Sequence, residues 1–415
     1  MTIEMAARPL NKSAEALVVA LAGALSLSVA MGIGRFAFTP LLPMMLHDGV
    51  IDLHGGSTLA TANYLGYLMG AVLCAMLPAL SRRLGRAMPD SARMVRLALV
   101  MTGVLTLAMA WQVVALWPVW RFASGVISAV AFVYTSAWCL ARLVALQSGH
   151  LGGVIYTGPG VGIALSGFAV FGMTASDASW ELGWLVFGIS ALVLTAFVWS
   201  VFTPRATMAS STATSSPAAP HAVSRLTLEE VLLILAYGLA GFGYIVTATF
   251  LPVIARSALP GSGWVDLFWP LFGIAVAIGA LLSRFVPLTM DRRLLLAICY
   301  AMQGMGVLVS LLVPDVTGFI ASSVLLGLPF TTLTLFAMQE VRRLRPGEAT
   351  GFIGLMTVCY SIGQIAGPPM VSAILARASS PADGFALSLE IAAGSLFLGA
   401  LIFGFMKLRF ALTDM

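Results

Sequence analysis

Long runs of apolar residues, separated by short polar loops, dominate the chain. Twelve runs are long enough to cross a hydrocarbon layer as helices, which takes about 20 residues each. They lack the alternating pattern of a membrane β-barrel, and a helix satisfies its own backbone hydrogen bonds inside lipid. The predicted helices cover 15–46, 58–80, 94–112, 114–141, 150–174, 181–202, 227–254, 265–287, 292–313, 317–340, 348–376 and 384–406. The pattern predicts an all-α membrane protein with twelve transmembrane helices.

Composition supports a lipid environment over an aqueous one. Hydrophobic residues make up 60% of the 415 residues and charged residues only 9%, whereas a soluble domain carries about 25% charged residues. A soluble enzyme, a disordered chain and a disulfide scaffold are therefore excluded. The four cysteines fall inside apolar segments and the four histidines in loops, so we expect no metal site, no cofactor and no disulfide framework.

Basic residues set the expected orientation. Most of the 22 lysines and arginines lie in the terminal segments and in alternate loops on the same side, and only Arg256 and Arg377 lie opposite. Loops rich in Lys and Arg stay on the cytoplasmic side. We therefore expect a multi-pass protein of the bacterial inner (plasma) membrane with both termini cytoplasmic.

One compositional break divides the chain. Residues 203–226 are rich in Ser, Thr, Ala and Pro, a composition typical of a flexible linker. The break separates an N-terminal six-helix bundle, 1–202, from a C-terminal six-helix bundle, 227–415. The linker is expected on the cytoplasmic side.

The two halves resemble each other. Gly32-Ile33-Gly34 precedes a Leu-Pro pair in the first helix, and Gly241-Phe242-Gly243 precedes a Leu-Pro pair in the seventh at the same spacing. Matches at the ends of helices 2 and 8 and within helices 5 and 11 follow in the same order. An even number of helices per unit makes the repeats parallel, so we predict two pseudo-symmetric six-helix bundles.

Three local motifs resemble those of the major facilitator superfamily. Arg83-Leu84-Gly85-Arg86 is similar to the Asp-Arg-x-Gly-Arg loop after helix 2, although Arg82 occupies the Asp position. Arg121, followed four residues later by Gly125, matches the embedded Arg motif of helix 4. The third motif is Gly158-Pro159-x-x-Gly162, which resembles the antiporter motif of helix 5, with Ile163 where a second Gly is expected. The resemblance implies the major facilitator fold, and the helix 5 motif implies proton-coupled export.

A closer resemblance covers helices 1 and 7. Residues 32–43 (GIGRFAFTPLLP), 237–244 (YGLAGFGY) and 248–252 (ATFLP) look like the YbfB/YjiJ-type branch of that superfamily. By this resemblance, helices 1, 4, 7 and 10 line a central cavity.

Two arginines lie within apolar helices, Arg35 in the first and Arg121 in the fourth. A charge in the bilayer centre costs about 2.5–3.5 kcal/mol or more, and the first half has no acid near mid-membrane. An unpaired guanidinium suits a planar carboxylate, so we expect both arginines to bind an anionic substrate. Two alternatives stay open: Arg35 reaches the interface or a loop acid, and Arg121 braces the backbone of the first half.

Other polar and flexible positions complete the candidate site. Tyr244 occupies the repeat position of Arg35 and is the first choice among the neutral groups. The remaining substrate-binding candidates are Tyr64, Tyr134, Tyr360 and Gln364. The gating or conformational candidates are Gly32, Gly34, Gly158, Pro159, Gly162, Gly241, Gly243, Arg83, Gly85 and Arg86, and the proton-coupling candidates are Glu390 and Glu340.

The expected function is secondary transport of a small organic solute, anionic or carboxylate-bearing, by rocker-switch alternating access. The alternative is proton-coupled efflux of drugs or other hydrophobic compounds. No His lies in the interior of a predicted span and no P-loop occurs, so we expect neither an enzyme with catalytic residues nor an ATP-driven pump. The expected partners are a small-molecule substrate, the lipid bilayer and protons as a coupling ion. We expect no nucleic acid and a functional monomer.

Overall fold

The computed structural model describes residues 12–203, 226–287, 289–345 and 349–410. Within these residues, twelve helical spans are long and apolar enough to cross a membrane. They begin and end within several residues of the predicted spans, so the twelve-helix prediction is confirmed. The predicted linker lies almost wholly outside the described residues.

The helices of the first half follow one another with short connections. They are α1 (Lys12–Leu27), the π-helix η1 (Ser28–Phe36), α2 (Phe38–His47), α3 (Leu53–Arg83), α4 (Ser91–Ala108), η2 (Val114–Leu116), α5 (Trp117–Ala145), η3 (Gly149–Leu151), α6 (Gly152–Ile155), α7 (Gly158–Ala175) and α8 (Trp180–Trp199). The elements α1, η1 and α2 together form the first span, and η3, α6 and α7 form the fifth.

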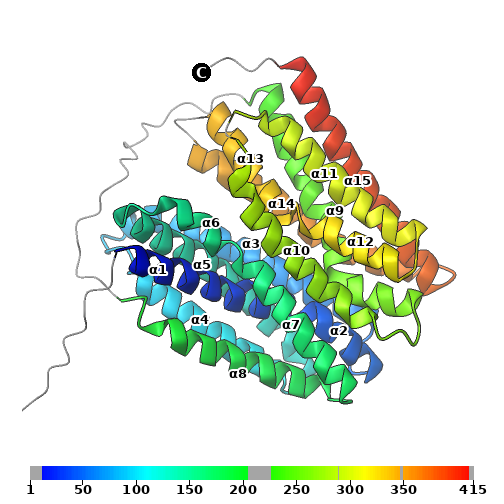
Figure 1. The fold of residues 1–415 in the computed structure, drawn as a ribbon. Coiled ribbons are helices and arrows are strands. Elements are labelled where there is room, and N and C mark those ends of the chain that lie inside the picture. Colours follow the sequence, from blue (N-terminus) through cyan, green and yellow to red (C-terminus); the bar gives the residue numbers. More distant parts are fainter. Residues whose placement is uncertain (1–11, 204–225, 288, 346–348, 411–415) are drawn as a thin grey trace, which may run out of the picture.

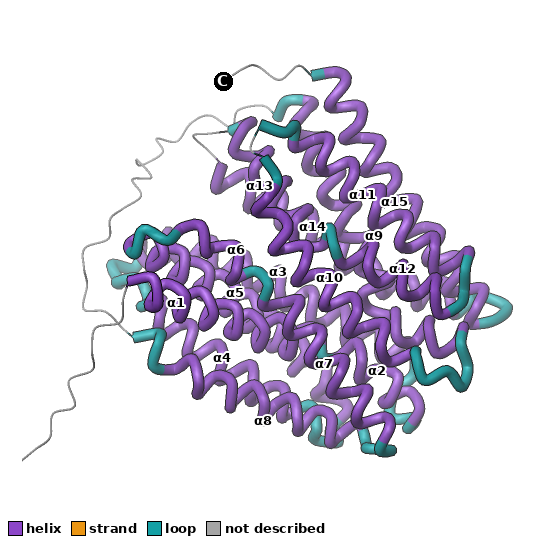
Figure 2. The backbone as a smooth tube through the Cα atoms, viewed as in Figure 1, coloured by secondary structure: helices purple, strands orange, loops and turns teal. Residues whose placement is uncertain are grey.

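The second half repeats the scheme. Its helices are α9 (Leu228–Ala258), η4 (Val265–Leu267), α10 (Phe268–Leu282), η5 (Ser283–Phe285), α11 (Arg292–Leu312), α12 (Val316–Gly327), α13 (Phe330–Leu344), α14 (Ala349–Leu375) and α15 (Pro381–Arg409). Figure 2 shows that helices joined by short loops make up the described chain. Within each half the helices pack as a bundle.

Polar side chains fix where several helices begin. Asp52 and Asp90 each accept a hydrogen bond from a backbone N–H of the first turn. Thr227 and Glu230 form a capping box at the start of α9. Such caps satisfy backbone donors that have no partner within the helix. Short polar loops therefore suffice to end one span and start the next.

The two bundles meet at one end and diverge at the other (Figure 1). The diverging end is the one at which α1 begins and α15 ends, called the terminal side below; the opposite end is called the far side. Among the described residues, the hydrogen bonds between the halves join Thr39 to Ala248, Tyr64 to Thr249, His54 to Ser372, Thr174 to Asp266 and Arg35 to Gln364. All of them lie from mid-span to the far side, so the structure is closed there.

The first span is not the continuous α-helix that its hydropathy predicts. Nine residues, Ser28–Phe36, form a π-helix, in which the wider turn moves backbone carbonyls off the regular ladder. Side chains of α5 accommodate this geometry: the Ser128 hydroxyl donates to the Ala30 carbonyl at 2.8 Å and the Ser124 hydroxyl to the Gly34 carbonyl at 2.8 Å. The π-helix therefore depends on contacts from another helix, which hydropathy does not report.

The fifth span is broken just before the Gly158-Pro159 pair. The helix stops at Ile155 and resumes at Gly158, with Pro159 in the first turn of α7. Proline suits that position because the first turn has no partner for its missing N–H. Gly162 then packs against the first span so closely that a Cβ added at Gly32 would lie 2.4 Å from its Cα.

Candidate functional site

Arg35 forms the centre of the polar contact between the halves. It lies in the last turn of η1 with 4% of its surface exposed. Its Nη2 donates to Oε1 of Gln364 on α14 at 2.9 Å, and Nε2 of Gln364 donates to the Tyr244 hydroxyl on α9. A chain of three side chains thus runs from the first half into the second.

The charged guanidinium of Arg35 makes cation–π contacts with aromatic rings. The guanidinium carbon lies 4.1 Å from the ring centroid of Tyr67 and 5.2 Å from that of Tyr64, both on α3. Within the described residues Arg35 has no ion pair, and its Nε is buried without an acceptor. Cation–π contacts compensate a buried charge only in part. Binding of an anion next to Arg35 is therefore still electrostatically favourable.

Aromatic rings extend from Arg35 toward the terminal side. Tyr244 stacks with Tyr360 at 5.8 Å between centroids, and Tyr360 contacts Tyr237 at 4.7 Å. Phe330 meets Tyr244 edge-on at 5.0 Å and Phe36 at 6.2 Å. Tyr360 and Phe330 are partly exposed. These contacts bring rings from both halves together in one wall.

Hydrogen bonds close the structure on the far side of Arg35. The Tyr64 and Thr249 hydroxyls lie 2.8 Å apart, and Thr39 donates to the Ala248 carbonyl at 3.0 Å. Nearer the far surface, His54 Nδ1 and the Ser372 hydroxyl lie 2.8 Å apart. Each pair joins the two halves, so a ligand at Arg35 is separated from the far side by this layer.

Arg121 lies beside Arg35 but has different partners. It is 2% exposed, and its Nη1 and Nη2 donate to the carbonyls of Gly34 and Arg35 at 3.3 and 3.2 Å. Its guanidinium carbon lies 4.8 Å from the Phe38 ring centroid. The two arginines lie side by side, because Arg121 bonds the backbone carbonyl of Arg35 itself. The contacts of Arg121 favour the bracing alternative, because its donors hold the π-helix.

Comparison with known proteins decides the family. The sequence model described as "Uncharacterised MFS-type transporter YbfB" matches residues 27–404, which is most of the chain. The chain belongs to this family of major facilitator transporters. No protein of curated function matches it in sequence. Among solved structures, it is similar to a point mutant of the nucleoside transporter NupG, with a TM-score of 0.69 and 14% identity over 94% of this chain and 100% of that one. At that identity the likeness supports the fold alone, which is the major facilitator fold.

The halves of this transporter touch through glycines of α7 and α10. A Cβ added at Gly160 would lie 2.5 Å from the Ala277 nitrogen, and one added at Gly167 would lie 2.5 Å from Cδ of Pro270. Small residues let helix backbones approach closely in membranes. The neighbouring candidates Gly158 and Gly162 instead pack within the first half, against Ala24 and Ser28.

We expect Gly167→Ala to open the far side of the transporter. The added methyl overpacks a contact between the halves, at a cost of about 1–3 kcal/mol, which shifts a two-state ratio roughly 5- to 150-fold. Spin labels at Thr58 and Arg377, which line one far-side groove between α3 and α14, report the separation by double electron–electron resonance in a cysteine-free background. Longer distances are expected for Gly167→Ala. Gly172→Ala is the control, because a Cβ there meets nothing within 4 Å. Equal spin-label distances in the two variants would contradict the idea that the contact of Gly167 with Pro270 keeps the far side closed.

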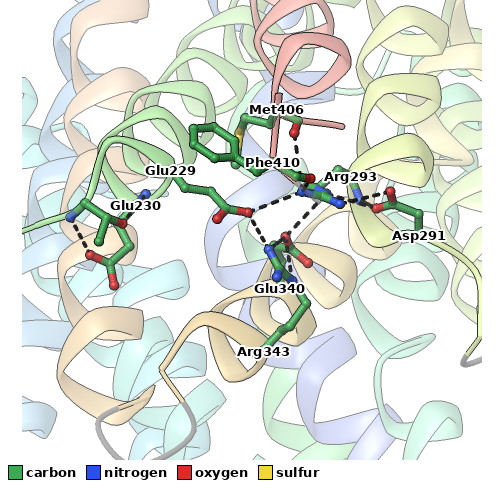
Figure 3. Close-up of polar contacts among 9 residues, drawn as sticks. Glu229, Glu230, Asp291, Arg293, Glu340, Arg343, Met406 and Phe410 are labelled. Carbon is green, nitrogen blue, oxygen red and sulfur yellow. Dashed lines mark hydrogen bonds and ion pairs between the residues drawn. The ribbon is translucent and has the colours of Figure 1, made fainter. Parts of the chain in front are cut away.

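A second polar centre lies at the terminal side of the second half. Arg293 is 1% exposed and donates to Glu229, Asp291 and the carbonyls of Met406 and Phe410 (Figure 3). It lies at the start of α11, and the carboxylates come from α9 and from the loop before α11. Burial acts to raise the pKa of the Asp291 carboxyl, but the hydrogen bonds from Arg293 outweigh burial and the pKa is lowered. Asp291 therefore stays ionised at neutral pH.

The proton-coupling candidates lie away from Arg35. Glu340 is fully buried in the terminal-side centre, where the Arg343 guanidinium donates to its Oε1 at 2.7 Å (Figure 3). Its Oε2 has no hydrogen-bond partner among the described residues. Glu390 is exposed on α15. Arg83, the last residue of α3, and Arg86 beyond the helix are both exposed, and Gly85 between them has a φ of 60°. Among the described residues, none of these four charged side chains forms a hydrogen bond or ion pair with the Arg35 site.

Arg293→Met is expected to destabilise the transporter by about 3–5 kcal/mol, since removing one partner of a buried ion pair leaves the other charge uncompensated. Glu229 and Asp291 would each lose a hydrogen-bond donor. The melting temperature in detergent measures the effect, with Arg284→Met as the control because Arg284 is exposed in η5, before α11. Equal melting temperatures for the two variants would contradict a stabilising role of the cluster.

Three neighbours of the Arg35 site were not among the candidates from sequence. Tyr67 packs against the guanidinium, Thr249 bonds Tyr64 across the halves, and Phe330 contacts Tyr244. Tyr67 has a signal in sequence, since it follows Tyr64 by nearly one helical turn. Tyr134, which was selected, is buried on α5 toward the terminal side.

Proposed function

We propose that this protein is a secondary transporter of small organic anions and that the carboxylate of the substrate binds Arg35. The observation that carries the proposal is the buried guanidinium between the halves, which has a neutral amide, Gln364, as its acceptor and no carboxylate among the described residues. A carboxylate forms a stronger, charge-assisted hydrogen bond than an amide does. The anion therefore competes with Gln364 for Arg35.

This competition supports alternating access of the rocker-switch type. The bond from Arg35 to Gln364 joins the two halves, so a substrate that takes the place of Gln364 releases a contact between them. The halves 1–202 and 227–415 then move against each other, joined by 203–226. We further propose that the termini and linker are cytoplasmic in a bacterial inner membrane and that the protein works as a monomer. Tyr244, Tyr64, Tyr360 and Gln364 are proposed to orient the substrate.

The placement of the acids favours uniport or exchange. Glu340 is tied to Arg343 and Glu390 is exposed on α15. A substrate that carries its own carboxylate also brings its own titratable group. Proton coupling therefore needs no protein acid at the Arg35 site in this proposal.

The second candidate function is efflux of hydrophobic compounds. The aromatic wall of Tyr237, Tyr244, Tyr360 and Phe330 favours it, because ring faces bind apolar bodies without regard to charge. Under this function Arg35 is structural and substrates are neutral or cationic.

Thermal stabilisation of the purified protein separates the two functions. A ligand that binds only the folded state stabilises it by about 2.7 kcal/mol at 100 times its Kd. Small carboxylates are set against lipophilic cations and neutral drugs, each with the wild type and Arg35→Gln. Stabilisation by carboxylates that Arg35→Gln removes is the expected result. Stabilisation by lipophilic cations in both proteins would support efflux instead and overturn the proposal.

A further inference from the structure

We propose that the substrate is an aromatic monocarboxylate: one carboxylate on a flat apolar ring, without a second charge and without a polyhydroxylated body. This inference rests on the proposed function, because it specifies the substrate of the same site. Three features of the Arg35 site support the inference: the number of available charges, the geometry of the Gln364 amide, and the aromatic surface beyond that amide.

The site offers a ligand one guanidinium whose terminal nitrogens are not held by backbone carbonyls. Arg35 donates to the Gln364 side chain across the contact between the halves, whereas the neighbouring Arg121 has both terminal nitrogens on backbone carbonyls. The other groups that face Arg35 are Tyr64, Tyr67 and Gln364, all neutral. A second carboxylate on the ligand would lose its hydration without meeting a cation, which is costly in a buried site. A dicarboxylate therefore fits worse than a monocarboxylate.

The amide of Gln364 occupies the position at which the substrate carboxylate is proposed to bind. A primary amide is planar and close in size to a carboxylate, and its Oε1 already lies 2.9 Å from Nη2 of Arg35. The Nε of Arg35 is buried and has no acceptor in the part of the chain that the structure describes. A carboxylate in place of the amide brings a second oxygen, which meets Nε in the two-pronged geometry that guanidinium groups prefer. The Tyr244 hydroxyl, which Gln364 contacts in this structure, is then released to donate to the same carboxylate.

The surface beyond the carboxylate position is aromatic. Tyr67 of the first half and Tyr360 of the second are both partly exposed, and both lie on the terminal side of the Arg35 layer because α3 runs toward that side and α14 away from it. Tyr360 is continuous with Tyr237 at 4.7 Å between ring centroids. A flat ring attached to the carboxylate would pack against the exposed parts of these two rings, in the offset or edge-on geometry that aromatic pairs prefer.

A sugar acid would find few partners on this surface. The Tyr237 hydroxyl lies 3.3 Å from that of Thr334, so this polar atom is already used within the protein. Ligand hydroxyls buried against ring faces would lose hydrogen bonds to water and gain none. Apolar rings meet no such penalty, which selects for an aromatic body over a polyhydroxylated one.

The test compares benzoate with four probes that each change one property. Acetate removes the ring, terephthalate adds a second carboxylate, gluconate replaces the ring with hydroxyls, and benzamide removes the charge. Dissociation constants are measured by isothermal titration calorimetry on the full-length protein at constant ionic strength. We expect benzoate to bind at least ten-fold more tightly than each of the other four, and this preference to disappear in Arg35→Gln.

The ring contribution is tested at Tyr67. We expect Tyr67→Leu to weaken benzoate binding at least five-fold and acetate binding less than two-fold, whereas Tyr67→Phe, which keeps the ring, retains wild-type affinity. Phe197→Leu is the matched control, since it removes a ring that is exposed on α8. Retained binding in Tyr67→Phe also separates a loss of the ring from a loss of the fold.

The possible outcomes separate the inference from the proposed function. If gluconate, acetate or terephthalate binds as tightly as benzoate and Arg35→Gln abolishes that binding, the aromatic monocarboxylate is overturned while anion transport stands. If benzamide binds as tightly as benzoate, or if no carboxylate depends on Arg35, the proposed function itself is overturned. An equal loss of benzoate and acetate in Tyr67→Leu would also overturn the role of the ring.

Discussion

Arg35→Gln is expected to make the ligand-free protein more stable and to abolish its stabilisation by benzoate. Arg35 is a buried charge without an ion pair among the described residues, and replacing buried charges by neutral groups is often stabilising by about 1–4 kcal/mol. Glutamine keeps a donor for the Gln364 amide across the halves. The same change removes the charge-assisted bond to the carboxylate, worth about 1.5–3 kcal/mol, or roughly 10- to 150-fold in Kd.

The measurement is the melting temperature of the wild type and Arg35→Gln, each with and without benzoate. Arg35→Lys serves as the control, because lysine keeps the charge and loses the planar fork, so weak residual stabilisation by benzoate is expected. A lower melting temperature of ligand-free Arg35→Gln would mean that Arg35 holds the halves together and that its charge is satisfied within the protein. The carboxylate hypothesis would then lose its main support.

Arg121→Gln is expected to destabilise the ligand-free protein and to leave its affinity for benzoate nearly unchanged. Its two terminal nitrogens donate to the Gly34 and Arg35 carbonyls of the π-helix, and each buried acceptor left without a donor costs about 1–3 kcal/mol. Ser124 still donates to the Gly34 carbonyl. Most of the loss of stability therefore comes from the Arg35 carbonyl, which loses its donor from Arg121. We expect a lower melting temperature and lower yield, and a benzoate Kd within about two-fold of the wild type in the protein that folds.

The matched control for Arg121 is Arg96→Gln. Arg96 donates to the carbonyl of Trp199 and stacks on its ring, so it also joins two helices of the first half, far from the Arg35 site. Its loss is expected to lower stability slightly without changing the affinity for benzoate. If Arg121→Gln kept the wild-type melting temperature and lost benzoate binding, the carboxylate would belong at Arg121 and the bracing role would be wrong.

The twelve spans were predictable from sequence because each depends on a single property. A run of apolar residues of sufficient length reports a membrane helix whatever its neighbours are. The π-helix Ser28–Phe36 was not predictable in this way, since its carbonyls are satisfied by Arg121, Ser124 and Ser128 from α5. A local pattern contains no information about such distant donors.

The candidate site was predictable only residue by residue. Arg35 stood out because a charge in an apolar helix is expensive, and Tyr244 because it occupies the repeat position. That both meet Gln364 is a consequence of how α14 packs against the first half. The positions of Glu340 and Glu390 likewise depend on packing: one is enclosed with Arg343 and the other faces outward on α15.

The central claim is that a ligand carboxylate replaces Gln364 on Arg35. Its most direct test is a crystal structure with 4-bromobenzoate, in which anomalous scattering locates the bromine and the density shows the carboxylate. We expect both carboxylate oxygens within hydrogen-bond distance of Arg35, a Gln364 amide that no longer accepts from Nη2, and the bromine on the terminal side between Tyr67 and Tyr360. A bromine elsewhere, with the bond from Arg35 to Gln364 intact, would contradict it.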